Sequence, residues 1–481
     1  MADAELAPKR VRKALVQFIF PFSIVPGTED DLIERLSQDG YVPFFLDRME
    51  QENAYYGEGY RVSHMRLERY FLPFTGQILF PHRQRSDAFR RYSRPLSWAC
   101  VMECRHQRTP FRVHSVDVIV CPFAMGFLTV RVEAEGGLEF SEALEFTARL
   151  RSLEDVSDKD DNARVHCDGQ VYEQVEDFLF HKLALGVLPF LDRTSREESY
   201  FETLPFFVDE RMFIQAFYQF EPTETITRID EYRAAQLDGF DDDGKPCVSA
   251  NNIRFIRDYI ERHGYHRWRP STVYLANEHT FTCLTSRDGK DARDSANQMY
   301  GEYYYGLLLN LFHKLVLLKL SSRYSHVRMG KDSREVEELI RSITAFSAKY
   351  YFLELVSQAQ GRDIFMLIRR VFGNDELLGE VKMTLTDLYK YQDREEAKST
   401  NYLLMILTVY TVIGGIYGMN QVIEDLKHPI DWSKMLAYSP FEYLALFLTM
   451  TGIVVGIVLG IVMLYKWVKD IAQRRRDQKR L

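Results

Sequence analysis

The chain has 481 residues, of which 27% are charged, and its formal net charge is −8. This acidic balance argues against a nucleic-acid-binding protein, because no basic stretch stands out except the C-terminal tail. The length leaves room for one or two sizeable folded domains, and six scattered cysteines are expected to be reduced thiols and not a disulfide framework.

The N-terminal segment combines basic residues with an apolar run. Four basic side chains between residues 9 and 13 precede the run Ala14 to Val25, an order that a secretory signal shares. Gln17, Pro21 and Pro26 interrupt the run, and no small-residue cleavage pattern follows. The segment is therefore predicted to be a buried first strand followed by a turn.

The region up to about residue 290 mixes strand and helix patterns, which predicts an α+β domain of one or two subdomains. Apolar and polar residues alternate from Leu128 to Glu133, the period of a half-buried strand. In chain order the predicted elements are strands at Val118–Cys121 and Leu128–Glu133, helices at Ser141–Leu153 and Val171–Leu185, and further strands within Ser271–Thr285. Acidic or glycine-containing linkers separate these blocks at Asp155–Asn162 and Leu237–Lys245.

From about Asp294 the pattern becomes helical. One helix is predicted to run to about Ser325, a second from about Ser333 to Gln360, and a third from about Asp375 without a break to Tyr417. In the third helix Leu378, Val381, Leu385 and Leu388 follow a heptad spacing that suits packing against neighbouring helices. If continuous, this helix would be about 65 Å long, which predicts a stalk.

The last eighty residues contain two apolar stretches without a charged side chain, residues 402–419 and 443–465. Each is predicted to be a transmembrane helix in contact with lipid. Lysine and arginine are concentrated in the tail 466–481 and just before the first stretch, whereas the connecting loop is acidic. The positive-inside rule therefore predicts a multi-pass protein of the plasma (inner) membrane with both termini in the cytoplasm.

The first stretch has two different helical faces. One side of the helix is mostly small or hydroxylated, and large apolar residues cover another. The first side consists of Thr400, Leu404, Thr408, Thr411 and Gly415. In a membrane such a stripe either lines water or packs against a helix, and the spacing of Gly414 and Gly418 favours packing. Because two helices cannot enclose a conducting path, a pore would have to be shared by several subunits.

The motif Gly418-Met419-Asn420 ends the first stretch, with a short loop, one more apolar stretch and a basic tail after it. In this layout the chain resembles the CorA family of divalent-cation channels over about residues 375–481. The resemblance implies a homopentamer, in which Gly418, Met419 and Asn420 form an external selectivity ring. Asn420 amides would hold a hydrated cation in its outer sphere, which suits magnesium because Mg²⁺ dehydrates reluctantly.

The resemblance also places Gly415, Thr411, Thr408, Leu404, Thr400 and Ala397 on the pore, the stripe already found from periodicity. Two departures concern the gate and the loop. Thr400 and Ala397 stand where the family has large apolar residues, and the loop carries both acids and lysines. The N-terminal region is also about a hundred residues longer than is usual in the family. This extra length leaves open a membrane effector gated by a nucleotide or another ligand bound to the cytoplasmic domain.

The sequence thus predicts an α+β cytoplasmic domain, long stalk helices and two C-terminal transmembrane α-helices in a CorA-like homopentamer. Its most favoured function is a divalent-cation channel for magnesium, with a zinc transporter of the same family or the ligand-gated effector as alternatives. The predicted segments are 1–290 (cytoplasmic domain), 291–401 (helical stalk), 402–420 (first span), 421–442 (external loop), 443–465 (second span) and 466–481 (tail).

Other candidate sites are weaker. Cys100, Cys104 and His106 lack a second ligand pair at zinc-finger distance. The acidic runs at Asp241–Asp243 and Asp158–Asp161 are interpreted as solvated turns, since position twelve of a calcium loop would be Ala250. No nucleophile has a base at an informative spacing, so neither an enzyme nor a cofactor is predicted.

Overall fold

The structure is a computed structural model, and its chain divides into two compact units, Met1–Leu385 and Thr386–Leu481. Each unit is described by itself. The described residues are 6–105, 107–135, 137–153, 163–192, 211–326, 333–352, 354–425, 438–444, 446–447, 450–451, 454 and 457–458.

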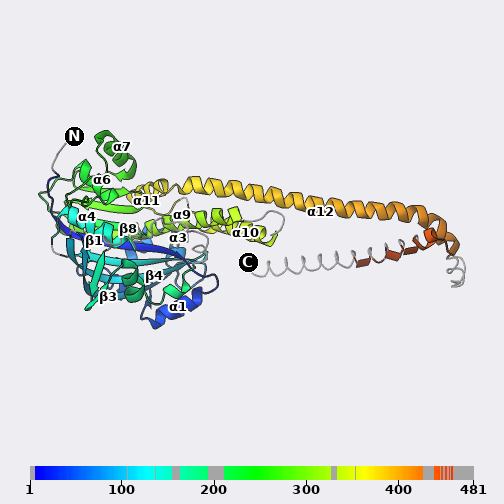
Figure 1. Ribbon diagram of the computed structural model, residues 1–481, viewed down its shortest axis with the longest axis horizontal. Coiled ribbons are helices and arrows are strands. Elements are labelled where there is room, and N and C mark those ends of the chain that lie inside the picture. Colours follow the sequence, from blue (N-terminus) through cyan, green and yellow to red (C-terminus); the bar gives the residue numbers. More distant parts are fainter. Residues whose placement is uncertain are drawn as a thin grey trace. The chain divides into compact units, whose positions relative to one another are not determined.

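The first unit is built on one large mixed sheet (Figure 1). Its strands are β1 (Val11–Ser23), β2 (Val42–Pro43), β3 (Arg90–Cys104), β4 (Gln107–Cys121), β5 (Met125–Ala134), β6 (Arg164–Cys167), β7 (Gln170–Tyr172), β8 (Phe213–Phe220), β9 (Gly264–Tyr265), β10 (Thr272–Ala276) and β11 (Thr280–Thr285). They lie in the order β7-β6-β3-β4-β5-β1-β8-β11-β10-β9, with β2 paired to β3. Of these pairings only that of β8 with β11 is parallel.

Strand β1 is central and is buried on both faces. Val16 and Phe18 belong to the core on one face, which also contains residues of α4 (Phe140–Arg151), whereas Gln17, between them, hydrogen-bonds across the other face to the carbonyl of Met299. A strand covered on both sides is apolar along most of its length and not only at alternate positions. The apolar run that predicted a buried first strand has this origin, and that prediction is confirmed.

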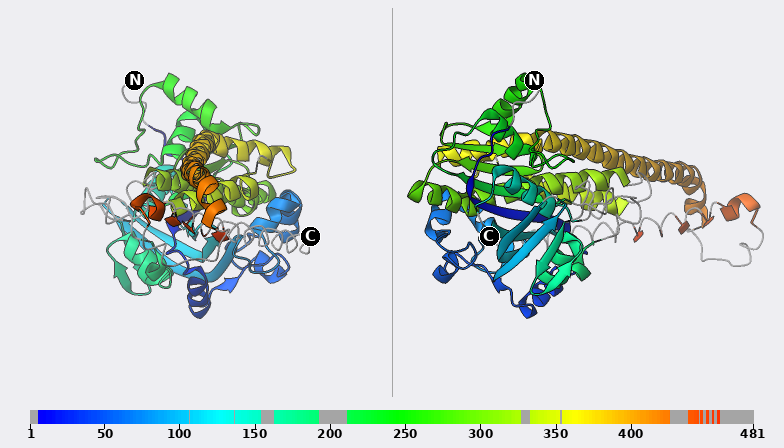
Figure 2. Two further views of the ribbon diagram at one scale, coloured as in Figure 1. Left: turned by 90° about the vertical axis from the view of Figure 1, so that its right-hand side faces the viewer. Right: turned by 60° about the vertical axis from the view of Figure 1, so that its left-hand side comes forward.

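Helices lie along both faces of the sheet (Figure 2). On the α4 face, α6 and α7 contribute to the same core. On the other face α8 packs on β8, and α9 packs against α8, α10 and α11. The remaining bounds are α1 (Glu29–Gln38), η1 (Met49–Glu52), α2 (His64–Tyr70), α3 (Pro73–Leu79), α5 (Val175–Phe178), η3 (Leu179–Leu183), η4 (Leu188–Phe190), α6 (Arg228–Gln236), α7 (Ile253–His263), α8 (Gly289–Tyr300), α9 (Glu302–His326), α10 (Ser333–Lys349), α11 (Ala359–Val371) and α12 (Asn374–Asp425).

Several local predictions are confirmed. The hairpin of β4 and β5 pairs Cys121 with Met125, so the strands enclose a three-residue turn. In that turn Phe123 and Ala124 have positive φ, and Lys319 of α9 donates to both of their carbonyls, at 3.0 and 3.3 Å. The helix predicted from Ser141 and the strands predicted within 271–285 are also present, as α4 and as β10 with β11.

Other boundaries differ from the prediction. The segment 171–185 forms β7, α5 and the π-helix η3, and not one helix. The helix predicted from Asp294 to Ser325 is two, because Gly301 leaves the helical conformation between α8 and α9. The helix predicted from Ser333 ends at Lys349, and the separate helix α11 was not predicted. Helices α8 to α11 belong to the same compact unit as the sheet.

Helix α12 is continuous over 52 residues, as its lack of proline predicted. It begins directly after Gly373, whose positive φ of 66° separates it from α11. It does not end at Asn420 but continues to Asp425, so Glu424 and Asp425 lie in the helix and not in an external loop. The predicted tail 466–481, most of 443–465 and the linker Asp155–Asn162 lie outside the described residues.

The prediction of two transmembrane helices is wrong for the part of the chain that the structure describes. A crossing needs about 20 mainly apolar residues in one helix. Among the described residues no helix is both long enough and apolar enough to meet that requirement. The α+β architecture of the N-terminal region stands, but the transmembrane fold class, the membrane keywords and the inner-membrane location derived from the two apolar stretches are corrected by this finding.

Candidate functional site

The structure places the residues of the predicted pore on one helix. Gly418, Met419 and Asn420 belong to the backbone of α12, and their side chains lie outside the described part. The described stripe residues Thr400, Leu404, Thr408, Thr411 and Gly415 are all exposed.

Two of the stripe hydroxyls bond within α12 itself. Thr408 Oγ1 donates to the carbonyl of Leu404 at 2.7 Å, and Thr411 Oγ1 donates to that of Leu407 at 2.8 Å. Such back-bonding satisfies a hydroxyl inside its own helix. The predicted magnesium ring stays a prediction, because its side chains lie outside the described part. In the described residues no group of three histidine, cysteine or carboxylate side chains could hold a metal ion.

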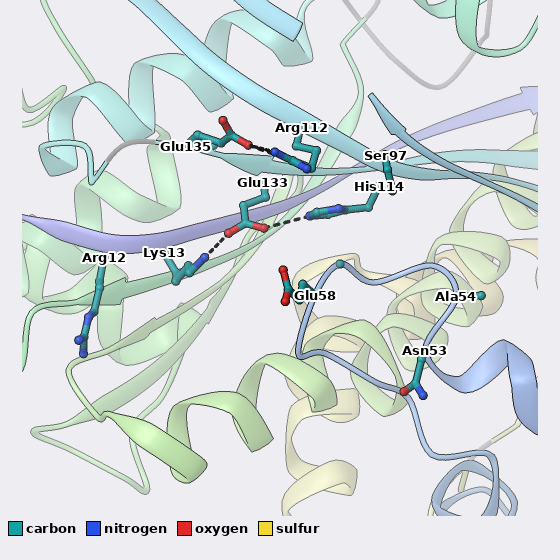
Figure 3. Close-up of a pocket in the computed structure, with 12 residues that line it drawn as sticks. Arg12, Lys13, Asn53, Ala54, Glu58, Ser97, Arg112, His114, Glu133 and Glu135 are labelled. Atoms are coloured by element: carbon teal, nitrogen blue, oxygen red, sulfur yellow. Dashed lines mark hydrogen bonds and ion pairs between the residues drawn. The ribbon is translucent and has the colours of Figure 1, made fainter. Parts of the chain in front are cut away.

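A cavity of about 680 Å³ lies in the first unit, between the sheet and the loop of residues 53–59 (Figure 3). Its walls are strongly polar, and they come from β1, β3, β4, the end of β5 and the loop. The lining residues are Arg12, Lys13, Asn53, Ala54, Gly57, Glu58, Ser97, Arg112, His114, Glu133, Ala134 and Glu135. We refer to this site as the sheet-edge pocket.

Glu133 organises the floor of the sheet-edge pocket. Its carboxylate accepts a hydrogen bond from Lys13 of β1, and its Oε2 lies 3.1 Å from Nε2 of His114 on β4 (Figure 3). Burial acts to raise the pKa of Glu133, but the hydrogen bonds from His114 and Lys13 outweigh it and lower the pKa from 4.5 to about 2. The carboxylate is therefore ionised at every pH near neutral and fixes both partners.

This depressed pKa predicts a pH-dependent contribution to stability. A carboxylate whose folded pKa is about 2 stabilises the fold fully above its unfolded value of 4.5, and that stabilisation is lost as the pH falls from 4.5 towards 2. Glu133→Gln should therefore lower the free energy of unfolding by about 2 kcal/mol at pH 7. Urea unfolding measured from pH 7 to pH 3 should show the difference between the two proteins shrinking below pH 4.5. A difference independent of pH would contradict the assignment.

The loop approaches His114 as closely as its backbone allows. Gly57 has a φ of 88°, and a Cβ added there would lie 2.7 Å from the imidazole atoms Cε1 and Nε2. The loop is anchored at its base, since Ser115 Oγ donates to the carbonyl of Tyr55 at 2.8 Å. Glycine is thus required at residue 57 both for its conformation and for the space that the ring occupies.

The rim of the sheet-edge pocket carries charges of both signs. Arg112 forms an ion pair with Glu135 at 2.9 Å, and Arg12 forms one with Asp288 at 2.8 Å. Both pairs are solvent-exposed, so exchanging them for contacts with a ligand costs little. Glu58 of the loop reaches towards the cavity and makes no hydrogen bond or ion pair with any described residue (Figure 3).

Ser97 marks an irregularity in the wall. It lies in a bulge of β3 between Pro95 and Trp98, and its φ of 59° is unusual for a residue other than glycine. Such bulges re-aim side chains next to functional sites. A nucleophilic role would require a hydrogen bond from Ser97 to a base, and none is formed to His114 in the described part of the chain.

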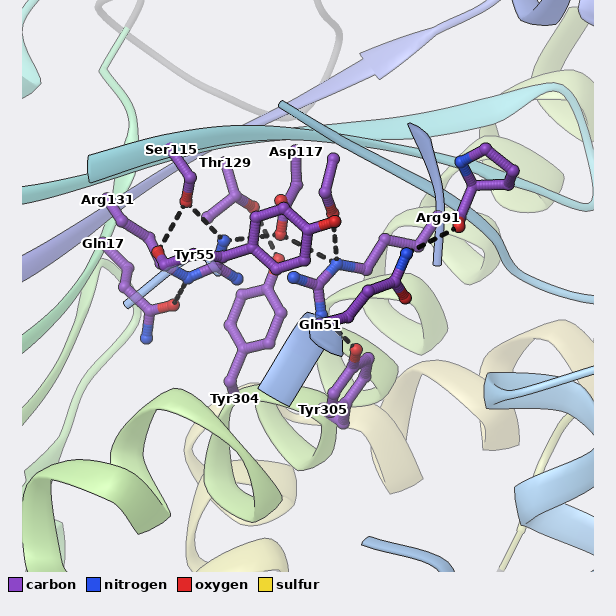
Figure 4. A network of polar contacts seen from close by, with 12 residues as sticks. Gln17, Gln51, Tyr55, Arg91, Ser115, Asp117, Thr129, Arg131, Tyr304 and Tyr305 are labelled. Atoms are coloured by element: carbon purple, nitrogen blue, oxygen red, sulfur yellow. Dashed lines mark hydrogen bonds and ion pairs between the residues drawn. The ribbon is translucent and has the colours of Figure 1, made fainter. Parts of the chain in front are cut away.

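A buried polar layer connects the pocket loop with the interior (Figure 4). Asp117 is fully buried, and its Oδ2 lies 2.6 Å from Nη1 of Arg131 and 3.0 Å from Nε of Arg91. The Arg131 guanidinium stacks between Tyr56 of the loop and Tyr304 of α9, 5.1 Å from each ring centre. Two buried cations thus share one buried anion, and aromatic faces compensate part of the remaining charge.

Helix α9 continues from this layer to the start of α12. Tyr304 and Tyr305, at its beginning, contact Thr129 and Arg91 of the sheet. Two turns further along α9 lies Asn310. Its carbonyl and its side-chain oxygen accept hydrogen bonds from Asn374 Nδ2, at 3.1 and 3.2 Å. Asn310 and Asn374 are both fully buried. The first three turns of α9 therefore contact both the polar layer and the first residue of α12.

Sequence reasoning missed the sheet-edge pocket altogether. Its residues are spread over β1, the loop, β3, β4 and β5, and no two neighbouring groups have the spacing of a known motif. One signal was available: the tyrosine- and glycine-rich stretch Tyr55–Tyr60 contains two glycines in a segment without apolar periodicity. Such a stretch indicates a shaped loop, which is where binding residues concentrate.

The other candidate clusters take simple forms. Asp241 Oδ1 accepts backbone hydrogen bonds from Asp243 and Lys245, at 3.1 and 2.8 Å, which makes this acidic run a turn. Of the weak zinc candidates, Cys100 lies against Cys167, and the sulfur of Cys104 contacts the carbonyl of Gln107. His106 and the acidic run 158–161 lie outside the described residues.

Comparison with known proteins found no matching family model, no matching curated protein and no matching solved structure. The resemblance to the CorA family, which rests on Gly418-Met419-Asn420 and its surroundings, therefore stays a prediction.

Proposed function

We propose that the first unit is a ligand-binding regulatory domain that takes a small, polar, charged molecule in the sheet-edge pocket. The observation that carries the proposal is the pocket itself, about 680 Å³ in volume and lined by three cationic and three carboxylate side chains. Ligand sites in proteins commonly have about 300–1,000 Å³. The alternative of a domain that senses a nucleotide or another ligand, left open by the sequence, agrees with this pocket. Cation conduction stays an untested prediction.

The charges of the pocket support a ligand that carries an anionic group and a hydrogen-bonding or cationic group. Arg12 and Arg112 stand on the rim in exposed ion pairs that a phosphate or carboxylate can replace. Glu58 and Asn53 face them from the loop and offer oxygen acceptors to an amine or a base edge. An apolar ligand finds few partners here, because most of the exposed wall is polar.

The contacts behind the pocket support a regulatory role. The loop that forms one wall is bound through Ser115 and Tyr56 to the buried arginine layer, and α9 reaches from that layer to Asn374. A ligand that binds one conformation of the loop more tightly than another favours that conformation. Its difference in affinity sets how far the populations of the loop and of the elements connected to it shift. The proposed output of binding is a change in α12.

Arg112→Ala is expected to weaken ligand binding at least tenfold, because it removes one charge-assisted contact on the rim. The ligand is first found by calorimetric titration of the full chain with AMP, ATP, GTP, NAD⁺, glutamate and arginine. The variant is then titrated with the compound that binds. The matched control is Arg341→Ala, which removes an exposed arginine paired with Glu337 on α10, away from the pocket.

Two results would contradict the proposal. The first is a bound compound whose affinity is the same in Arg112→Ala and in the wild type. The second is no binding by any of these charged compounds while the protein is folded, as judged by its circular dichroism. An unchanged affinity in Arg341→Ala together with a loss in Arg112→Ala supports it.

A further inference from the structure

Two cysteines face each other across neighbouring strands. Cys100 of β3 pairs in register with Cys167 of the antiparallel strand β6, and their Sγ atoms are 2.9 Å apart. Directly opposed residues of antiparallel strands have Cα atoms about 4.5–5.5 Å apart, inside the 4.4–6.8 Å that a disulfide spans. The backbone therefore already has the separation that a bond between these two sulfurs requires.

The other cysteines are placed differently. Cys104 contacts the carbonyl of Gln107 through its sulfur, and none of the six cysteines, all of them described, is in a disulfide. Cys100 and Cys104 lie four residues apart on one extended strand, too far for a bond between them. The pairing of Cys100 with Cys167 is thus a property of the sheet register and not of the sequence spacing, because 66 residues separate the two.

We propose that Cys100 and Cys167 are a redox pair. A low-molecular-weight disulfide such as oxidised glutathione oxidises them, and they form a cross-strand disulfide with each other. One thiol loses its proton, and its thiolate attacks a sulfur of the oxidant to give a mixed disulfide and one glutathione thiolate. The second thiolate then attacks the mixed disulfide and releases the other glutathione. In balance, the two cysteines lose two electrons and two protons, and one oxidised glutathione becomes two reduced glutathiones.

The position of the pair defines what the bond would change. β6 and β7 form a short hairpin at the end of the strand order, and among the described strands it pairs with the rest of the sheet through β3 alone. Asp168, the residue after Cys167, accepts a hydrogen bond from Lys182 at 3.0 Å. The Lys182 ammonium also lies 4.8 Å from the ring centre of Trp98 on β3. A disulfide would fasten this edge hairpin covalently to β3, the strand that also carries the Ser97 bulge.

Burial sets the conditions for the reaction. Both thiols are almost fully buried, and burial raises the pKa of Cys100 and that of Cys167. A neutral, covered thiol exchanges slowly. Oxidation should therefore proceed through opening of the β6–β7 hairpin, whose short strands at the end of the sheet make such opening the cheapest local route to solvent.

The test uses the full chain under native conditions with oxidised glutathione. Remaining thiols are alkylated, and the protein is digested with trypsin without reduction. The expected product joins the peptides 92–105 and 165–182 with the loss of two hydrogens, and fragmentation places the bond on Cys100 and not on Cys104. Hydrogen exchange in β6 and β7 should slow on oxidation and recover after treatment with dithiothreitol.

The variants separate the pair from general thiol reactivity. Cys167→Ser should abolish the cross-link and leave Cys100 as an alkylated thiol or a mixed disulfide with glutathione. Cys247→Ser, which removes a more accessible cysteine, should leave the cross-link unchanged. The proposal fails if the wild type shows both cysteines alkylated, if only mixed disulfides with glutathione accumulate, or if Cys167 is joined to Cys104. Because the wild type alone gives these readouts, a variant that does not fold leaves the test intact.

Discussion

Asp117→Asn is expected to lower the free energy of unfolding by about 3–5 kcal/mol, a large share of the stability of a domain. The substitution keeps the shape of the side chain but removes the carboxylate charge that forms ion pairs with the guanidinium groups of both Arg91 and Arg131. All three side chains are almost fully buried, so water cannot replace the lost interaction. Urea unfolding of the full chain, followed by tryptophan fluorescence, measures the change.

The matched control is Glu135→Gln, which removes a carboxylate from the exposed pair with Arg112. An exposed ion pair contributes at most about 1 kcal/mol, so this variant should unfold close to the wild type. Equal losses of unfolding free energy in the two variants would mean that burial of the Asp117 ion pairs contributes no additional stability. A loss below 1 kcal/mol in Asp117→Asn would show that the arginines find other compensation.

Gly57→Ala should cost about 2–4 kcal/mol of stability and should also disturb the floor of the sheet-edge pocket. The added methyl group would meet the His114 ring at 2.7 Å on a backbone with positive φ. The imidazole can only yield by moving, and its movement breaks the contact with Glu133. Unfolding in urea gives the loss of stability. The imidazole chemical shifts of His114, measured by NMR, report the changed contact.

Gly59 offers the control for the backbone effect alone. It has a similar φ of 83°, but nothing lies within 4 Å of the Cβ that alanine would add. Gly59→Ala should therefore cost only the conformational penalty, about 1–2 kcal/mol, and leave the His114 shifts unchanged. If both variants lose the same stability and neither changes the His114 shifts, the close approach of the loop has no energetic consequence.

Periodicity predicted those elements whose burial follows a simple rule. The alternation from Leu128 to Glu133 gave the strand β5, and the mainly apolar run after residue 14 gave β1. The prediction that β5 is half-buried is wrong, because Thr129 and Arg131 are fully buried as well. The absence of proline after Asp375 gave the continuity of α12. The same reasoning missed α11 and the split at Gly301, because a pattern of apolar positions does not mark where a helix stops.

The length of an apolar stretch was the misleading signal. The runs at 402–419 and 443–465 suggested two membrane crossings, but no helix in the described ranges of the chain is long and apolar enough for one. The spacing of Thr400, Thr408 and Thr411 is that of one face of a helix, and α12 runs through all three residues. It carried no information on what covers that face, because the partner of a helix face lies elsewhere in space.

The sequence by itself determined the local elements: the buried first strand, the β4–β5 hairpin and the long helix that begins at Asn374. Only the tertiary structure decided the sites. Sheet register brings Lys13, His114 and Glu133 together and sets Cys100 against Cys167. The physical reason is that local conformation depends on neighbouring residues, whereas a pocket, a buried charge pair or two opposed thiols depend on strand pairing between distant segments.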